Sequence, residues 1–168
     1  LIRSATKLTS EILADCKNLK VVGRAGVGVD NVDLDTATKN KILVMNTPLG
    51  NLEATAELTI GLMFSLYRHI HLANQSTHDG KWEKSKFMGT ELKGKTLGIV
   101  GFGNIGQRVA EMASVIGMKI ITNSNSASDE DLSKFSASKV STEKLLTDSD
   151  VLSLHTKLND NTKNMLNK

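Results

Sequence analysis

Three glycines with the spacing of a phosphate-binding turn are the first feature of chemical interest. Gly101, Gly103 and Gly106 lie in a Gly-Phe-Gly-Asn-Ile-Gly run. The apolar run at residues 97–100 predicts a strand directly before them, and the spacing at residues 104–117 predicts a helix directly after. In that setting Gly101 permits a tight turn, Gly103 lets a pyrophosphate approach the backbone, and Gly106 lets the helix pack closely. Because the helix N-terminus also offers free N–H groups to phosphate, the motif predicts a dinucleotide site.

The acidic residue expected next in such a motif is missing. A carboxylate about 20 residues beyond the first glycine normally binds the adenosine ribose hydroxyls. This chain has Asn123, Ser124 and Asn125 in that region, and its next carboxylates, Asp129 and Glu130, come later. Ser124 takes the ribose position, or an amide of Asn123 or Asn125 takes it instead. Because no carboxylate lies there, the selectivity of the site for NAD over NADP is expected to be weakened, and no arginine lies nearby to favour the 2′-phosphate of NADP either.

A second glycine-rich segment occupies residues 23–31, directly after an apolar run at residues 19–22. Backbone N–H groups in such a turn can bind an anion. Arg3 ends an earlier apolar stretch, so it lies at the same edge if both runs belong to one parallel sheet. An arginine beside a glycine turn would bind a carboxylate or a phosphate. An ordinary turn with a surface arginine fits the spacing equally well.

The elements that must position these motifs predict an α/β fold with a parallel sheet, because short β-branched runs alternate with helical spacing. Strands are expected at residues 19–22, 42–45, 97–100, 118–121 and 151–154. Helices are expected at residues 11–17, 34–40, 51–73, 104–117 and 141–146, with Ser10 and Asp33 as the caps of the first two. Residues 74–93 are expected to form an irregular connection and residues 124–130 a polar loop.

Composition excludes several other kinds of protein. The net charge of +3 comes from 21 basic and 18 acidic residues that are scattered along the chain, and aromatic residues are few, so no nucleic-acid surface is expected. No apolar run approaches the roughly 18 residues of a membrane span. With one cysteine, Cys16, and four histidines without metal-ligand spacing, neither a disulfide nor a metal site is expected. These features, and the lack of a leader segment, predict a cytoplasmic protein. Both ends of the sequence look cut.

The chain resembles the D-2-hydroxyacid dehydrogenase family, and within it most closely the phosphoglycerate dehydrogenases. The resemblance covers essentially the whole chain. It is carried by residues 3–7, 22–31, 45–48, 50–51, 56–59, 79–83, 86–92 and 101–106. Arg3 and the segment at residues 86–92 separate the phosphoglycerate dehydrogenases from their lactate, formate and glycerate relatives.

This resemblance implies a two-domain, Rossmann-like parallel-sheet fold, truncated at both ends in this chain. Residues 1–49 would form the later part of the substrate domain, and residues 50–168 the crossover helix and the first half of the NAD-binding domain. The implied activity is NAD-dependent oxidation of 3-phosphoglycerate to 3-phosphohydroxypyruvate, the first step of serine biosynthesis. The implied partners are a phosphorylated 2-hydroxy acid and further copies of the chain, in a dimer or tetramer.

The resemblance also implies roles for individual residues. Substrate binding would fall to Arg3, Gly26 and Asn51. Cofactor binding would fall to Val27, Gly101, Gly103, Asn104, Ile105, Gly106, Ser124 and Thr156. The family's catalytic arginine, carboxylate and histidine would follow Lys168, so no catalytic residue is expected in this chain and the chain alone is expected to be inactive.

Four positions depart from the family pattern on the side of the cofactor. The family usually has arginine at Asn104, aspartate at Ser124, often a hydroxyl residue at Val27, and proline at Lys157. These departures support an alternative, a decayed relative that binds nucleotides or assembles without catalysis. A dehydrogenase for another 2-hydroxy acid is a further alternative.

Overall fold

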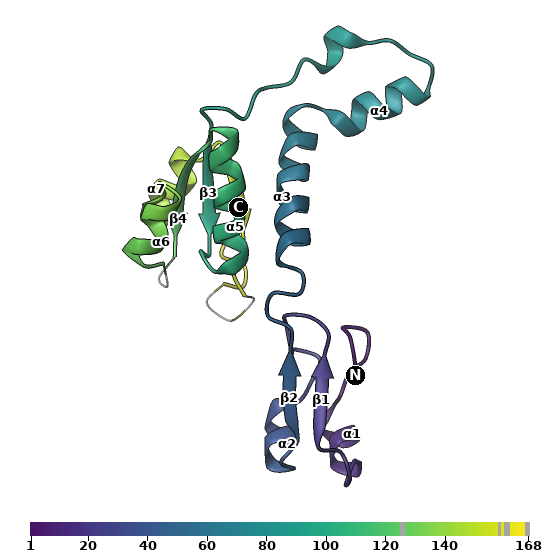
Figure 1. Cartoon of the computed structure of the whole chain (residues 1–168). Helices are drawn as coiled ribbons and strands as arrows, with labels where there is room; N and C mark the ends of the chain where they lie inside the picture. The colour runs from purple at the N-terminus through teal and green to yellow at the C-terminus, as the bar shows by residue number, and fades with distance from the viewer. Residues whose placement is uncertain (125–126, 158, 160–161, 167–168) are drawn as a thin grey trace. The chain divides into compact units, whose positions relative to one another are not determined.

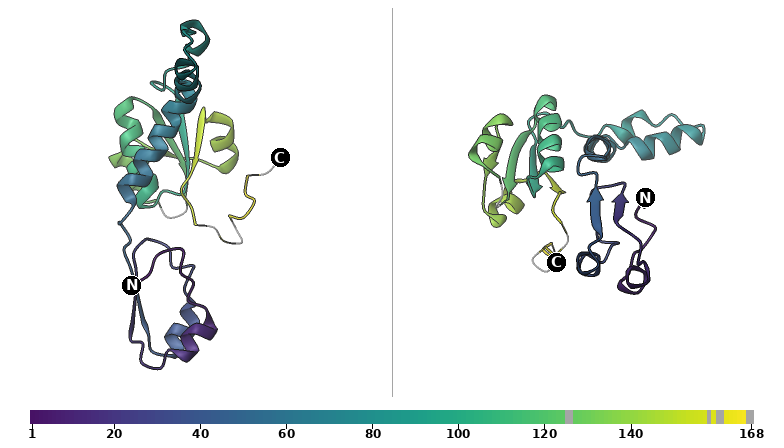
Figure 2. Two further views of the ribbon diagram at one scale, coloured as in Figure 1. Left: turned by 90° about the vertical axis from the view of Figure 1, so that its right-hand side faces the viewer. Right: turned by 60° about the horizontal axis from the view of Figure 1, so that its bottom comes forward.

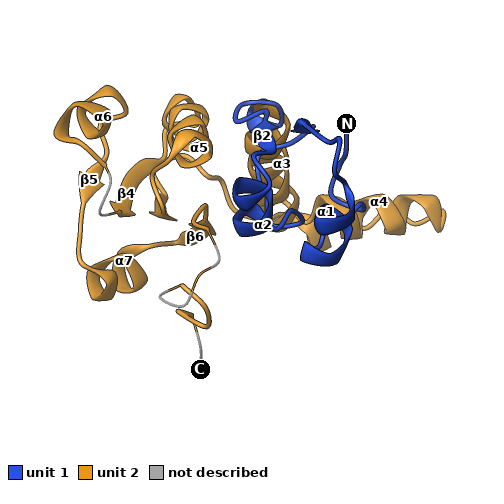
Figure 3. Ribbon diagram, turned by 90° about the horizontal axis from the view of Figure 1, so that it is seen from below, with its two compact units in different colours: residues 1–52 blue, residues 53–168 orange. Residues whose placement is uncertain are grey.

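The computed structural model of the protein describes residues 1–124, 127–157, 159 and 162–166. Its chain divides into two compact units, Leu1–Leu52 and Glu53–Lys168 (Figure 3). Each unit is an assembly of parallel strands and helices with its own core, so the predicted parallel-sheet α/β fold is confirmed.

The first unit is a pair of parallel strands with two short helices (Figures 1 and 2). Its elements are α1 (Ser10–Asp15), β1 (Val21–Arg24), α2 (Leu34–Lys39) and β2 (Leu43–Asn46). Five buried residues form its core: Leu13, Val22, Val32, Ala37 and Ile42. The predicted cap at Asp33 is confirmed, because its side chain accepts a hydrogen bond from the Thr36 nitrogen at 2.8 Å. The predicted cap at Ser10 is wrong, since Ser10 is the first residue of α1 and Thr9 precedes it.

The second unit contains a four-stranded parallel sheet. Its strands are β3 (Thr96–Val100), β4 (Lys119–Asn123), β5 (Ser138–Lys139) and β6 (Val151–Leu154). Their spatial order is β5-β4-β3-β6, so the chain crosses from one edge of the sheet to the other between β5 and β6. The short β5 was not predicted, because its two residues are too few to form an apolar pattern.

Helices cover both faces of this sheet. α5 (Asn104–Ile116) and α6 (Asp129–Lys134) lie on one face, and α7 (Thr142–Asp148) lies on the other (Figure 3). The prediction of a polar loop through residues 124–130 is wrong at its end, where α6 begins. Ser128 caps this helix by accepting from the Asp131 nitrogen at 3.1 Å, and Leu132 buries its apolar side in the core.

The long helix predicted at residues 51–73 is two helices, α3 (Leu52–Tyr67) and α4 (Ile70–His78). The break lies at His69, whose φ is +53°. At this point the Tyr67 carbonyl accepts a hydrogen bond from the Thr90 nitrogen at 2.8 Å, a contact from the following connection. That connection is also less irregular than predicted, because α4 continues into it and a 3-10 helix, η1 (Lys84–Phe87), follows.

Candidate functional site

Three neighbouring strands of the second unit end at the same edge of the sheet. In the parallel register of β3 with β4 and β6, the next residues along the chain are Gly101, Ser124 and His155. Ligands of parallel α/β sheets bind beyond the carboxyl ends of the strands. The register therefore places the glycine motif and Ser124, both predicted from sequence, at one candidate ligand site.

Gly101 forms the turn after β3 with a φ of +87°, a conformation that residues other than glycine rarely adopt. A β-carbon at this position would lie 2.7 Å from the His155 carbonyl oxygen and 3.0 Å from the Thr156 nitrogen. The turn thus packs against the backbone that follows β6 and leaves no room for a side chain. This contact brings Thr156 beside the first glycine of the motif.

The next two glycines shape the start of α5, with Gly103 as its N-cap. Apart from Gly103 itself and its two neighbours in the chain, no described residue has a heavy atom within 4 Å of the point where a β-carbon of Gly103 would be. A β-carbon on Gly106 would instead collide with the Gly101 carbonyl oxygen, so this glycine permits the close packing expected of it. Asn104 is exposed and Ile105 half-buried in the first turn of the helix.

Phe102 anchors the glycine turn from the side of the core. Its side chain is 1% exposed, and its ring meets that of Phe135 edge-on with centroids 6.1 Å apart. The Gln107 side chain adds a hydrogen bond, since its Nε2 donates to the Phe102 carbonyl at 3.1 Å. The turn is therefore held on its core side by Phe102, while the space next to Gly103 is uncrowded.

Ser124 follows β4 directly and its side chain is 7% exposed. Asn123, the first alternative for the ribose position, donates from Nδ2 to the Val140 carbonyl at 3.0 Å and so is bound to the neighbouring segment. Asn125, the other alternative, lies outside the described residues. The assignment of the ribose to Ser124 stays a prediction.

His155 follows β6, and its Nε2 lies 2.8 Å from the Ser153 hydroxyl oxygen. Burial lowers the pKa of the His155 imidazole below its ordinary value of 6.5, so the ring is neutral at pH 7. Beyond the neighbouring strand β3, the uncrowded space at Gly103 and the N-terminus of α5 fit a pyrophosphate group. The residues at this edge therefore suit a dinucleotide.

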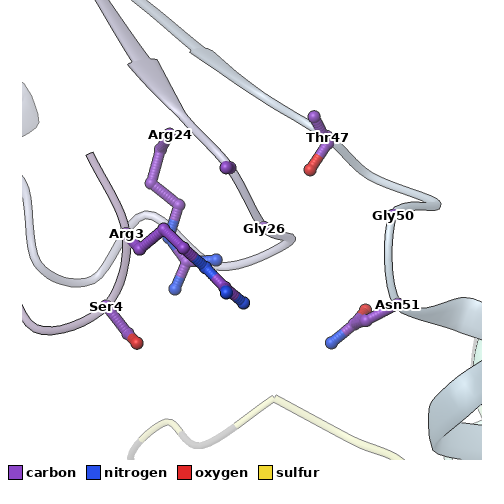
Figure 4. Close-up of a pocket in the computed structure, with 8 residues that line it drawn as sticks. Arg3, Ser4, Arg24, Gly26, Thr47, Gly50 and Asn51 are labelled. Carbon is purple, nitrogen blue, oxygen red and sulfur yellow. The ribbon is translucent and has the colours of Figure 1, made fainter. Parts of the chain in front are cut away.

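A cavity of about 410 Å³ in the first unit gathers the residues predicted to bind substrate (Figure 4). It is lined by Arg3, Ser4, Arg24, Ala25, Gly26, Thr47, Gly50 and Asn51. Arg3, Gly26 and Asn51, which the resemblance assigns to the substrate, thus lie on one cavity. Figure 4 shows the Arg3 side chain reaching into this space, with Arg24 beside it and Asn51 opposite. Two guanidinium groups at one cavity favour a ligand with negative charge.

Arg24 was not singled out by sequence reasoning. Its Nε is buried and has no hydrogen-bond partner in the described part of the chain. A β-carbon on Gly26 would collide with the Arg24 guanidinium, so only glycine lets this side chain fold over the turn. Arg24 ends β1, and there it pairs in a parallel bridge with Ile2, the residue before Arg3, which a single sequence does not show.

Val27 is the one predicted cofactor residue of the first unit. It lies in the first unit but does not line the cavity, and its carbonyl accepts from Asn46 Nδ2 at 2.7 Å. The other predicted cofactor residues lie in the second unit. Among the residues described, no group of three or more His, Cys, Asp or Glu side chains could hold a metal ion. In the same part of the chain, no helix has the length and apolar character needed to cross a membrane.

Known proteins match the chain along its whole length. A family model described as D-isomer specific 2-hydroxyacid dehydrogenase, NAD binding domain, matches residues 60–168. Human D-3-phosphoglycerate dehydrogenase is 48% identical over 167 residues, which are 99% of this chain and 31% of that protein. Hydroxypyruvate reductase of Thermotoga maritima is 45% identical over 168 residues, 100% of this chain and 54% of that protein.

A solved structure extends this similarity to three dimensions. The apo-structure of D-lactate dehydrogenase from Escherichia coli matches with a TM-score of 0.87 and 31% sequence identity, covering 99% of this chain and 53% of that one. The chain therefore spans about a third of the length of the human relative and about half of the other two.

Proposed function

Because this chain belongs to the family of D-isomer-specific 2-hydroxyacid dehydrogenases and carries their NAD-binding domain, we propose that its protein oxidises 3-phosphoglycerate to 3-phosphohydroxypyruvate. The similarity to relatives named D-3-phosphoglycerate dehydrogenase supports this substrate, and the reaction would open the route to serine. We assign residues 1–49 to the substrate-binding part and residues 50–168 to the crossover helix and the nucleotide-binding part.

The observation that carries the proposal is the cavity lined by Arg3 and Arg24. 3-Phosphoglycerate has two anionic groups, a carboxylate and a phosphate, and a guanidinium binds either one with paired hydrogen bonds. The buried Nε–H of Arg24 has no acceptor among the described residues, so it can donate a hydrogen bond to such a group. Asn51, on the same cavity, is assigned to the substrate, and Gly26 brings the Arg24 guanidinium over the turn.

On the cofactor side, the backbone of Gly101, Gly103 and Gly106 would receive the pyrophosphate at the start of α5, beside Asn104 and Ile105. Ser124 would lie at the adenosine ribose and Thr156 beside the cofactor, while Val27 is assigned to it from the first unit. When bound, NAD accepts a hydride from C2 of the substrate. We assign removal of the hydroxyl proton to no residue of this chain, because the resemblance gives that role to residues after Lys168.

Assembly into a dimer or tetramer is part of the proposal. Leu58, Leu62 and Leu66 recur every four residues on one face of α3 and are 62%, 60% and 64% exposed. An apolar stripe of this kind is covered in many proteins by another subunit. We assign it to a contact between copies of the protein, and a location in the cytoplasm stays a prediction.

A second function is favoured by the reductase of Thermotoga maritima, whose name indicates a hydroxy acid without phosphate. Initial rates of NADH formation by the intact protein, with 3-phosphoglycerate or D-glycerate, separate the two. We expect preference for 3-phosphoglycerate, and we expect Arg3→Gln to lower its kcat/KM by about 100-fold, the effect of losing a charged hydrogen bond. Arg68→Gln, an exposed arginine on the second unit, is the control and should change nothing.

Each other outcome selects a different function. Preference for D-glycerate, with no effect of Arg3→Gln, indicates another 2-hydroxy acid as substrate. NAD binding without turnover of either acid indicates a nucleotide-binding protein that does not catalyse.

A further inference from the structure

The turn that carries the first arginine of the cavity is held by a side chain from outside the cavity. Asn31 Nδ2 donates to the carbonyl oxygen of Arg3 at 2.9 Å and to that of Thr6 at 2.6 Å. Within the turn itself, the Thr6 nitrogen donates to the same Arg3 carbonyl at 3.2 Å. One amide group thus binds both ends of the Arg3–Thr6 segment.

Two parallel bridges frame this segment. Ile2 pairs with Arg24 before it, and Leu8 pairs with Val32 after it. The residues between the bridges leave the sheet, so their position depends on the contacts they make locally. Asn31 lies one residue before the second bridge, which fixes its backbone next to the turn that it binds.

The amide of Asn31 stabilises the turn through its donors alone. Its Oδ1 is buried without a hydrogen-bond partner in the described residues. A buried amide oxygen in that state opposes folding, because it has lost its bond to water. The side chain therefore gives up one hydrogen bond while it makes two bonds to the backbone around Arg3.

We propose that Asn31 is a positioning residue that sets the backbone of Arg3, so that the Arg3 guanidinium meets the anionic substrate beside Arg24 without reorganisation. The inference rests on the proposed function, in which Arg3 binds the substrate. Holding a binding group in place before the ligand arrives removes an ordering cost from binding. Asn31 acts through Arg3, and it touches no substrate atom itself.

The test compares Asn31→Leu with Asn40→Leu in the intact protein. Asn40 is a matched control in the same unit, since its Nδ2 donates to the Leu13 carbonyl at 3.0 Å and it does not line the cavity. Asn31→Leu loses two long-range hydrogen bonds from a side-chain amide to the backbone, and Asn40→Leu loses one. We expect Asn31→Leu to weaken the binding of 3-phosphoglycerate about tenfold, as the loss of a hydrogen bond does. We expect Asn40→Leu to leave that affinity unchanged, and equal effects of the two variants would overturn the inference.

A double-mutant cycle with Arg3→Ala separates positioning from general stability. If Asn31 acts through Arg3, Asn31→Leu has no further effect on affinity once the arginine is gone. An undiminished effect in the Arg3→Ala background would show that Asn31 acts elsewhere, and the inference would be wrong.

The same cycle distinguishes the inference from the proposed function. If Arg3→Ala leaves the affinity for 3-phosphoglycerate unchanged, the proposed substrate role of Arg3 fails. The positioning of Arg3 is then decided by the order parameters of its backbone N–H and Nε–H groups in the free protein. We expect both to fall in Asn31→Leu and to stay unchanged in Asn40→Leu, and unchanged values in Asn31→Leu would overturn the positioning as well.

Discussion

Gly101 lies too close to the backbone of His155 to carry a side chain, since a β-carbon on Gly101 would lie 2.7 Å from the His155 carbonyl oxygen. The two residues follow neighbouring strands, β3 and β6, at the same edge of the sheet. The contact joins the glycine turn to the segment that contains Thr156. The position of Thr156 at the candidate cofactor site therefore depends on residue 101 being glycine.

Gly101→Ala is expected to destabilise the protein. The positive φ alone costs a residue with a β-carbon about 1–2 kcal/mol, and the collision with His155 adds to this. Urea unfolding measures the change in the free energy of unfolding. Gly61→Ala in α3 is the control. Outside its own stretch of helix, no described residue would crowd a β-carbon there, and a helical alanine is expected to stabilise by about 0.5–1 kcal/mol. Equal stability of Gly101→Ala and the natural protein would contradict the structure at this turn.

Gly103→Ala is expected to separate binding from stability. Its β-carbon meets no described atom, so the free energy of unfolding should change by less than about 0.5 kcal/mol. The added methyl group occupies the space assigned to the pyrophosphate, and we expect NAD to bind about tenfold more weakly or worse, a change of about 1.4 kcal/mol. Titration of NAD by fluorescence measures it, and an unchanged affinity would show that the pyrophosphate lies elsewhere.

Ser124→Asp is expected to shift the cofactor preference toward NAD. A carboxylate accepts hydrogen bonds from both ribose hydroxyls, and bonds to a charged group contribute roughly 1.5–3 kcal/mol. We expect NAD to bind about tenfold more tightly and NADP more weakly, because its 2′-phosphate is repelled.

Ser128→Asp is the matched control for Ser124→Asp, since Ser128 is the N-cap of α6 and has no assigned ligand role. Both cofactors are titrated against each variant. An unchanged ratio of NAD to NADP affinity in Ser124→Asp would show that Ser124 does not occupy the ribose position.

His155 is expected to make stability depend on pH. Burial lowers the pKa of His155 in the folded protein below the ordinary 6.5, which the unfolded chain keeps. Between the folded-state and the unfolded-state pKa, the unfolded chain therefore binds more protons than the folded one. The contribution of the neutral imidazole is complete above pH 6.5 and is lost as the pH falls through the folded-state pKa. Unfolding measured between pH 5 and pH 7.5 should show this slope, and His155→Gln should remove it.

His71→Gln serves as the control for the loss of an imidazole, because His71 is exposed on α4. It should leave the slope in place. A slope that persists in His155→Gln would assign the pH dependence to another group.

The chain of residues 1–168 is expected not to oxidise 3-phosphoglycerate, because no catalytic base is assigned within it. NADH formation is measured with the purified chain at millimolar substrate, and the same assay without protein sets the background. Steady NADH production in proportion to added protein would contradict this prediction and point to a base within the chain.

Elements with a strong local pattern were predictable from the sequence, and those set by distant contacts were not. The run before Gly101 is buried and apolar, so β3 and the helix after it appeared in the pattern. The break at His69 did not, because the apolar spacing continues through it. It coincides with a hydrogen bond from Thr90, far along the chain, to the Tyr67 carbonyl.

The candidate site was predictable to the same degree. Gly101, Gly103 and Gly106 are recognisable because backbone conformation and close packing restrict those positions to glycine. Arg24 was missed because its significance comes from pairing, in which the bridge to Ile2 brings it beside Arg3. A single sequence without its register does not show that these two arginines share a cavity.

The ring of Phe102, set in the core against Phe135, has a consequence for motion. Because this ring belongs to the main hydrophobic cluster of the second unit, the turn between Gly101 and Gly103 cannot open while the core stays closed. The backbone N–H order parameters of this turn should then match those of the buried strands of the sheet. The turn that we assign to the pyrophosphate would then already have its final shape before any ligand arrives.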